Sequence, residues 1–156
     1  MLQRIQSIYL FLVILVAVLF LFFPLGSLRL NGESVSIMLT GSDLAQENFA
    51  GAYANLYRFS LYVLLVVAMV FTAYIIFQYG KRLFQIRLGK IHILLHLIIL
   101  VITFFYLDHL RASVPGSSLS YGPSVFFPLV SLFLILMSNK AIMKDEKLVR
   151  AADRIR

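Results

Sequence analysis

The sequence contains no cysteine and no tryptophan, and charged residues make up only 13% of its 156 residues. The lack of cysteine excludes disulfides, thiolate metal sites and cysteine nucleophiles. Acidic residues are also scarce, because seven aspartates and glutamates stand against fourteen lysines and arginines. No G-x-S-x-G, phosphate-binding loop or H-E-x-x-H motif is present, so the sequence predicts no enzymatic activity and no catalytic residues.

What the sequence has instead is apolar bulk. Hydrophobic residues make up 61% of the chain, and its mean hydropathy is +0.91. A soluble domain is about half apolar and about a quarter charged. This chain has more apolar surface than one small soluble core can bury, whereas lipid-facing positions can remain apolar. We therefore expect an all-α membrane protein with a single domain, residues 1–156.

Long uncharged windows separate the charged residues, and a membrane-spanning helix needs about 20 such residues. They predict four spans, at about residues 5–24, 57–79, 88–107 and 122–139. The connecting segments are outer loops 25–56 and 108–121, a cytoplasmic loop 80–87 and a cytoplasmic tail 140–156. Pro128 lies inside the fourth span, where a proline is expected to kink a helix.

The basic residues predict the direction of the spans. Eleven of the fourteen fall on one side, before the first span, between the second and third, and after the fourth. The positive-inside rule assigns that side to the cytoplasm, together with both termini. The net charge of +7 is then explained by anionic lipid at the cytoplasmic leaflet, and nucleic acid is not expected as a partner.

These observations predict an up-down-up-down bundle of four transmembrane helices. In the first outer loop, alternating apolar residues flank Asn31-Gly32, which is a strong signal for a small outer β-hairpin. Apolar residues recur at helical spacing in the tail, which predicts a C-terminal amphipathic helix. The basic residues proposed to dock on lipid or on a partner are Lys140, Lys144, Lys147, Arg150, Arg154 and Arg156.

The two ends of the chain carry a family resemblance. The chain opens with Met1-Leu2-Gln3-Arg4-Ile5-Gln6-Ser7-Ile8-Tyr9. It closes with Lys144-Asp145-Glu146-Lys147-Leu148-Val149-Arg150-Ala151-Ala152-Asp153-Arg154-Ile155-Arg156. Together with the overall length, these segments resemble domain-of-unknown-function family 4293. The resemblance implies a four-span inner-membrane protein of bacteria that have two membranes. It implies no activity and no functional residues.

His92 and His96 are candidate cofactor-binding residues, because four-residue spacing places both imidazoles on one face of the third span. Redox use with a quinone or haem would need further groups from a partner, since the other spans contain no histidine. The alternative is a structural role, with hydrogen bonds to backbone, lipid or a partner. No cofactor and no metal is predicted from this chain alone.

Arg58 and Asp108 end neighbouring spans on the outer side, so we expect an ion pair that clamps the bundle there. Asp43 and Glu47 are alternative partners for Arg58. The leading hypothesis for function is a non-catalytic accessory subunit that binds another protein of the bacterial inner membrane. The alternatives are a redox subunit that uses His92 and His96, and a lipid-binding membrane protein.

Overall fold

The structure is a computed structural model that describes residues 3–30, 33–40 and 52–153. Four long helices dominate it, namely α1 (Gln3–Phe22), α3 (Ala52–Phe77), α4 (Arg82–Ser113) and α5 (Phe127–Asp153). Each is long and apolar enough to cross a membrane, and only 28% to 39% of each apolar window is buried. Most of the apolar surface of these helices therefore faces outward.

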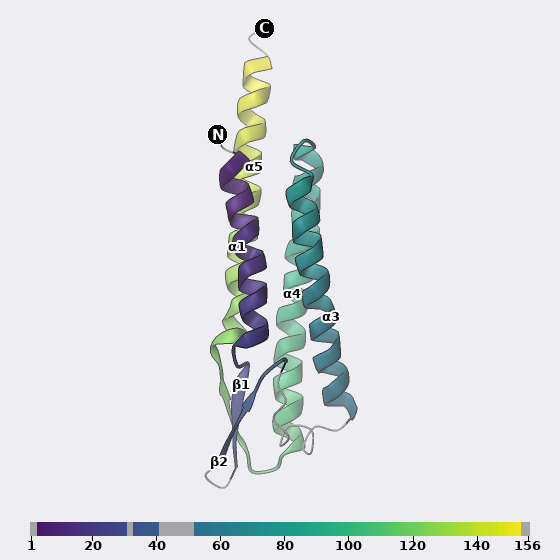
Figure 1. The fold of residues 1–156 in the computed structure, drawn as a ribbon, viewed down its shortest axis with the longest axis vertical. Coiled ribbons are helices and arrows are strands. Elements are labelled where there is room, and N and C mark those ends of the chain that lie inside the picture. The colour runs from purple at the N-terminus through teal and green to yellow at the C-terminus, as the bar shows by residue number, and fades with distance from the viewer. Residues whose placement is uncertain (1–2, 31–32, 41–51, 154–156) are drawn as a thin grey trace.

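The helices extend past the uncharged windows of the sequence. Helix α4 includes Arg82 and Arg87, and α5 continues through the basic tail as far as Asp153. Lysine and arginine are good helix formers, so a charge marks the edge of an apolar stretch and not the end of a helix. The tail is thus a direct continuation of α5, and it projects beyond the other helices at the end opposite the sheet (Figure 1).

A small antiparallel sheet lies at the other end of the molecule (Figure 1). Its strands are β1 (Gly26–Leu30), β2 (Glu33–Ile37) and β3 (Ser118–Tyr121), in the order β2-β1-β3. The pairing of β1 with β2 confirms the predicted hairpin, although Asn31 and Gly32 themselves lie outside the described residues. The prediction is incomplete, because the outer loop 108–121 contributes a third strand that pairs with β1 from Gly26–Tyr121 to Arg29–Ser118.

Two glycines let the chain pass close to itself beside the sheet. A Cβ atom on Gly122 would lie 2.3 Å from the carbonyl oxygen of Pro24, and one on Gly26 would lie 2.7 Å from that of Ser120. The Gly122 N–H donates to the carbonyl of Leu25 at 2.8 Å. These contacts join the end of α1 to the segment that begins α5.

The entry into α5 corrects the expected kink at Pro128. A 3₁₀ turn, η1 (Pro123–Phe126), precedes the helix, and Pro128 is the second residue of α5. In the first turn of an α-helix the backbone N–H lacks a partner within the helix, so proline is tolerated there. Pro123 starts η1 for the same reason.

The four helices pack around a common interior, in which α1 and α4 each contact both α3 and α5. The larger apolar cluster lies in the half near the sheet and includes Phe20, Leu25, Leu61, Tyr106 and Leu107. A smaller cluster of Leu10, Ile75 and Leu88 lies in the opposite half. That second half also contains buried polar side chains, among them Gln6, Thr72 and Gln85, together with the apolar Ile142.

Candidate functional site

The buried polar residues of α4 form one stripe along the helix. Gln85, His92, His96 and Thr103 are all buried and recur at intervals of about one or two helical turns. The two histidines were predicted as candidate site residues, whereas Gln85 was expected in the loop 80–87. The same spacing carries the signal for all four, because they belong to the helix face that also holds Leu88 and Ile99.

His92 is fully buried, and its hydrogen bonding determines which ring nitrogen carries the proton. The Thr72 hydroxyl donates to the carbonyl oxygen of Ala68 at 2.7 Å. A hydroxyl has one proton, so Thr72 Oγ1 must accept from His92 Nε2, which lies 3.1 Å away. The proton of the neutral imidazole is therefore on Nε2. His92 Nδ1 is an acceptor that is buried without a hydrogen-bond partner among the described residues.

His96 bonds to its own helix. Its Nδ1 atom lies 3.2 Å from the carbonyl oxygen of His92, and a carbonyl only accepts, so Nδ1 carries the proton. The two imidazoles are in edge-to-face contact, with ring centroids 4.6 Å apart and planes at 80°. Phe71 of α3 packs against His92 in a similar way at 5.6 Å. The His92 ring is therefore held between α3 and α4.

This geometry bears on a haem ligated by both histidines. Two axial ligands of one haem approach the iron from opposite faces of the macrocycle, whereas these rings touch one another directly. Residues 3–30, 33–40 and 52–153 also contain no cluster of three His, Cys, Asp or Glu side chains able to hold a metal ion. The histidine pair therefore has the geometry of a hydrogen-bonded packing element.

Gln85 joins the start of α4 to the end of α3. Its Nε2 atom donates to the carbonyl of Ile75 at 3.0 Å, and its Oε1 atom is buried without a hydrogen-bond partner in the described part of the chain. Residue 85 falls in the segment expected to be a cytoplasmic loop, so its burial was not anticipated. The extra turns of α4 place it inside the bundle.

The two helix ends that carry Arg58 and Asp108 lie next to each other. Arg58 and Asp108 do not form an ion pair among the described side chains, and Asp108 is exposed beside a hollow of about 430 Å³. Their sequence neighbours meet instead, because the rings of Tyr57 and His109 lie 5.6 Å apart. The two helix ends are adjacent as predicted, but their rotation selects a different pair. Asp43 and Glu47 lie outside the described residues.

An ion pair occurs at the opposite end of the molecule, where Arg82 Nε lies 3.3 Å from Asp145 Oδ2. The two groups are close but lack the alignment of a hydrogen bond. Both side chains are mostly buried, at 24% and 16% exposure. This contact holds the projecting part of α5 against the start of α4.

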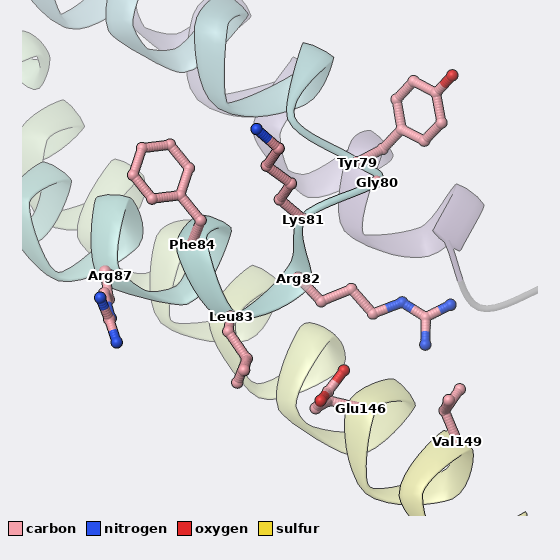
Figure 2. A pocket seen from close by; sticks show the side chains of 9 residues that line it. All are labelled: Tyr79, Gly80, Lys81, Arg82, Leu83, Phe84, Arg87, Glu146 and Val149. Carbon is pink, nitrogen blue, oxygen red and sulfur yellow. The ribbon is translucent and has the colours of Figure 1, made fainter. Parts of the chain in front are cut away.

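An open cleft of about 710 Å³ lies beside Arg82 (Figure 2). It combines basic, aromatic and aliphatic side chains with one carboxylate. Its lining residues are Tyr79, Gly80, Lys81, Arg82, Leu83, Phe84, Arg87, Glu146 and Val149. Lys140, Lys144 and Lys147 of the predicted docking tail are exposed on α5 nearby. The Arg150 side chain, Arg154 and Arg156 lie outside the described structure.

Comparison with known proteins places the chain in a family. Neither the curated proteins nor the solved structures provide a match to this chain. A sequence model of the family described as a domain of unknown function (DUF4293) matches residues 2–155, which is nearly the whole chain. The chain therefore belongs to the DUF4293 family.

Proposed function

We propose that this chain is a multi-pass protein of the bacterial inner membrane, with its four helices crossing in alternate directions and both termini in the cytoplasm. Four helices of sufficient length and hydropathy support the crossings. The charge distribution supports the direction, because Lys81, Arg87, Lys90 and Lys144 are exposed at the end opposite the sheet. Basic residues favour the cytoplasmic side.

Within the membrane, the proposed role is that of a non-catalytic accessory subunit of a larger complex. The observation that carries this proposal is how the helices use their polar side chains. Thr72, His92 and His96 bond within the bundle, Thr103 donates to the carbonyl of Ile99, and Ser138 donates to that of Gln6. Ion and proton pathways commonly place ionisable groups in cavities at mid-membrane. Here the Thr72–His92 and Ser138–Gln6 contacts connect helices, and the His96 and Thr103 bonds stay within α4, which favours a scaffold.

Helix α3 offers a regular outward face for a partner. Its large exposed apolar side chains recur at spacings of three and four residues, which is the pattern of a helix-packing seam. They include Leu56, Phe59, Val63, Val66, Val70 and Phe77. Lipid also covers such a face, so the proposal requires a test that separates the two.

That test is extraction of the tagged full chain from its native membrane in mild detergent, followed by mass spectrometry of the co-purifying proteins. A variant with Val66→Trp and Val70→Trp should lose a partner that the wild type retains, because the bulky rings disturb a packed seam. Val18→Trp on the exposed side of α1 is the control. A stable chain with no specific partner would refute the accessory role.

The direction of the spans has an independent test, since the chain lacks native cysteine. Ser118 in β3 and Ala151 in α5 are both exposed. In intact inner-membrane vesicles or spheroplasts with the outside exposed, Ser118→Cys should react with a membrane-impermeant thiol reagent and Ala151→Cys should not. Equal labelling of both positions would contradict the proposed crossing pattern.

The redox alternative has less support, because the proton of each imidazole is already donated within the bundle. A haem absorption band in the purified native complex, lost on His92→Leu, would revive it. The lipid-binding alternative is favoured by one specific observation, the mixed basic and apolar cleft at the start of α4.

A further inference from the structure

We propose that the cleft at the start of α4 binds the headgroup of an anionic phospholipid. The inference rests on the membrane placement proposed above, but not on the accessory role. The cleft of about 710 Å³ lies between the α3–α4 connection and the projecting part of α5. Its place beside the apolar ends of α3 and α4 puts it at the level where lipid headgroups begin.

The local sequence at this helix start is unfavourable unless an anion is near. The N-terminus of an α-helix carries partial positive charge and free N–H groups. Helix α4 has no acidic residue in its first turn, and its N-cap residue, Lys81, makes no capping side-chain hydrogen bond. Lys81 and Arg82 add positive charge at that same point. A bound phosphate would compensate for all of these features together.

The Asp145 carboxylate compensates for only part of the positive charge at the start of α4. It contacts the Nε atom of Arg82, which leaves the two Nη groups further out along the side chain. In Figure 2 the Arg82 guanidinium extends toward α5 beside Glu146 and Val149. An arginine held at one edge keeps its fork of donors in a defined place, which suits recognition of phosphate oxygens.

Lys81 and Arg87 flank the cleft on different sides of α4 (Figure 2). Both side chains are exposed, so they are able to swing onto an anion without breaking a packed contact. Glu146 opposes them and sets a limit on affinity. Lys81 and Arg87 make no ion pair among the described residues, and together with the helix terminus they favour an anion.

The apolar lining argues for a lipid as the source of the phosphate. Tyr79, Leu83 and Phe84 are exposed around the same cleft. A site for a small water-soluble anion has no need of these surfaces, whereas acyl chains and the interface would cover them. A phospholipid headgroup and free phosphate would make the same ionic contacts. Only the phospholipid would also cover the apolar rim of the cleft.

The experiment uses the detergent-purified full chain, titrated with short-chain phosphatidylglycerol, and counts bound lipid by native mass spectrometry. Phosphatidylcholine and inorganic phosphate are the comparison ligands. We expect one phosphatidylglycerol per chain, bound more tightly than phosphatidylcholine. Lys81→Gln with Arg87→Gln should weaken it by roughly tenfold or more, because charge-assisted hydrogen bonds are lost. Arg82 is left intact, since it also holds α5.

The matched control is Lys90→Gln with Lys144→Gln, which removes the same charge from exposed positions that do not line the cleft. An equal loss of binding in both double variants would overturn the site and indicate diffuse attraction. Full competition by inorganic phosphate would overturn the choice of a lipid. Arg87→Gln alone should also weaken binding, which keeps the test valid if the double variant folds poorly. Because no partner protein is present, failure here is separate from failure of the accessory role.

Discussion

The two halves of this bundle achieve packing in different ways. In the half near the sheet, a large apolar cluster joins α1, α3, α4 and the sheet, with Phe20, Ile37 and Tyr106 almost fully buried. In the opposite half the apolar cluster consists of Leu10, Ile75 and Leu88 among the described residues. There, hydrogen bonds of Thr72 and Gln85 and the Arg82–Asp145 ion pair supply contacts between helices.

Apolar packing and hydrogen bonding constrain the two halves to different degrees. Apolar packing is non-directional, so it stabilises the sheet half without selecting any particular kind of ligand. Hydrogen bonds are directional, and buried polar groups without partners are costly. The half opposite the sheet, called the basic half below, therefore tolerates fewer arrangements of its side chains. The basic half also has a smaller apolar cluster, so it resists relative movement of α3, α4 and α5 less.

The largest effect is expected from closing the tight backbone crossing beside the sheet. Gly122→Ala places a methyl group 2.3 Å from the carbonyl oxygen of Pro24, which is backbone and has little freedom to move. Overpacking of this kind costs about 1–3 kcal/mol. The midpoint of thermal unfolding in detergent, followed by circular dichroism, should fall by several degrees.

Gly80→Ala is the control for that variant, because no atom lies within 4 Å of its Cβ position. It should leave the midpoint unchanged or raise it slightly by restricting the unfolded chain. If the two glycine variants unfold together, the sheet half is looser than the contact distances indicate, and the comparison between the halves loses its basis.

The next effect is expected from the polar contact between α3 and α4. Thr72→Val removes the oxygen that accepts from His92 Nε2 and leaves a buried donor unpaired. The expected cost is about 1–3 kcal/mol. Thr72→Ser retains the hydroxyl and should recover most of the loss. Replacing both partners, with Thr72→Val and His92→Leu, should cost less than the two single changes added together.

That double-variant result also distinguishes a packing role from a chemical one. A structural pair becomes nearly dispensable when both polar groups are replaced by apolar ones. A variant that unfolds normally but loses a co-purifying partner or cofactor would instead show that His92 acts beyond packing. The measurements are the thermal midpoint and the composition of the purified complex, taken on the same samples.

The sequence was sufficient to predict the local features of this fold. Uncharged runs predicted four long apolar helices, and Asn31-Gly32 with flanking alternation predicted the pairing of β1 with β2. Strand β3 was missed because Ser118–Tyr121 is short and mostly polar, and its partner β1 lies far away in the sequence. The pairing of β3 with β1 depends on how α4 and α5 position the segment between them, and a local sequence pattern contains no information about that position.

The same limit applies to the candidate site. Four-residue spacing was enough to place His92 and His96 together, but the partner Thr72 depends on the rotation of α3 against α4. The contact between the start of α3 and the end of α4 illustrates this rotation, since Tyr57 and His109 meet where Arg58 and Asp108 were expected. One residue changes the direction of a side chain by about 100° around a helix. Proximity of helix ends was predictable, whereas the contacting pair was not.

A smaller effect is expected where α4 and α5 approach closely. A Cβ atom on Gly89 would lie 2.0 Å from Asn139 Oδ1, but the amide is the end of a side chain and is able to rotate. Gly89→Ala should therefore cost about 1 kcal/mol, at the lower end of overpacking effects. Adding Asn139→Ala should restore part of the midpoint. A double variant as unstable as the sum of both changes would show that these residues do not share one contact.

The smallest effect is expected from the ion pair between Arg82 and Asp145. Part of each side chain reaches solvent, so the interaction energy from a cycle of Arg82→Gln and Asp145→Asn should be under about 1 kcal/mol and should decrease with salt. Unfolding midpoints at low and high salt measure it. An interaction that persists at high salt would mean that the pair is shielded in the folded protein. The projecting part of α5 would then be a fixed wall of the cleft.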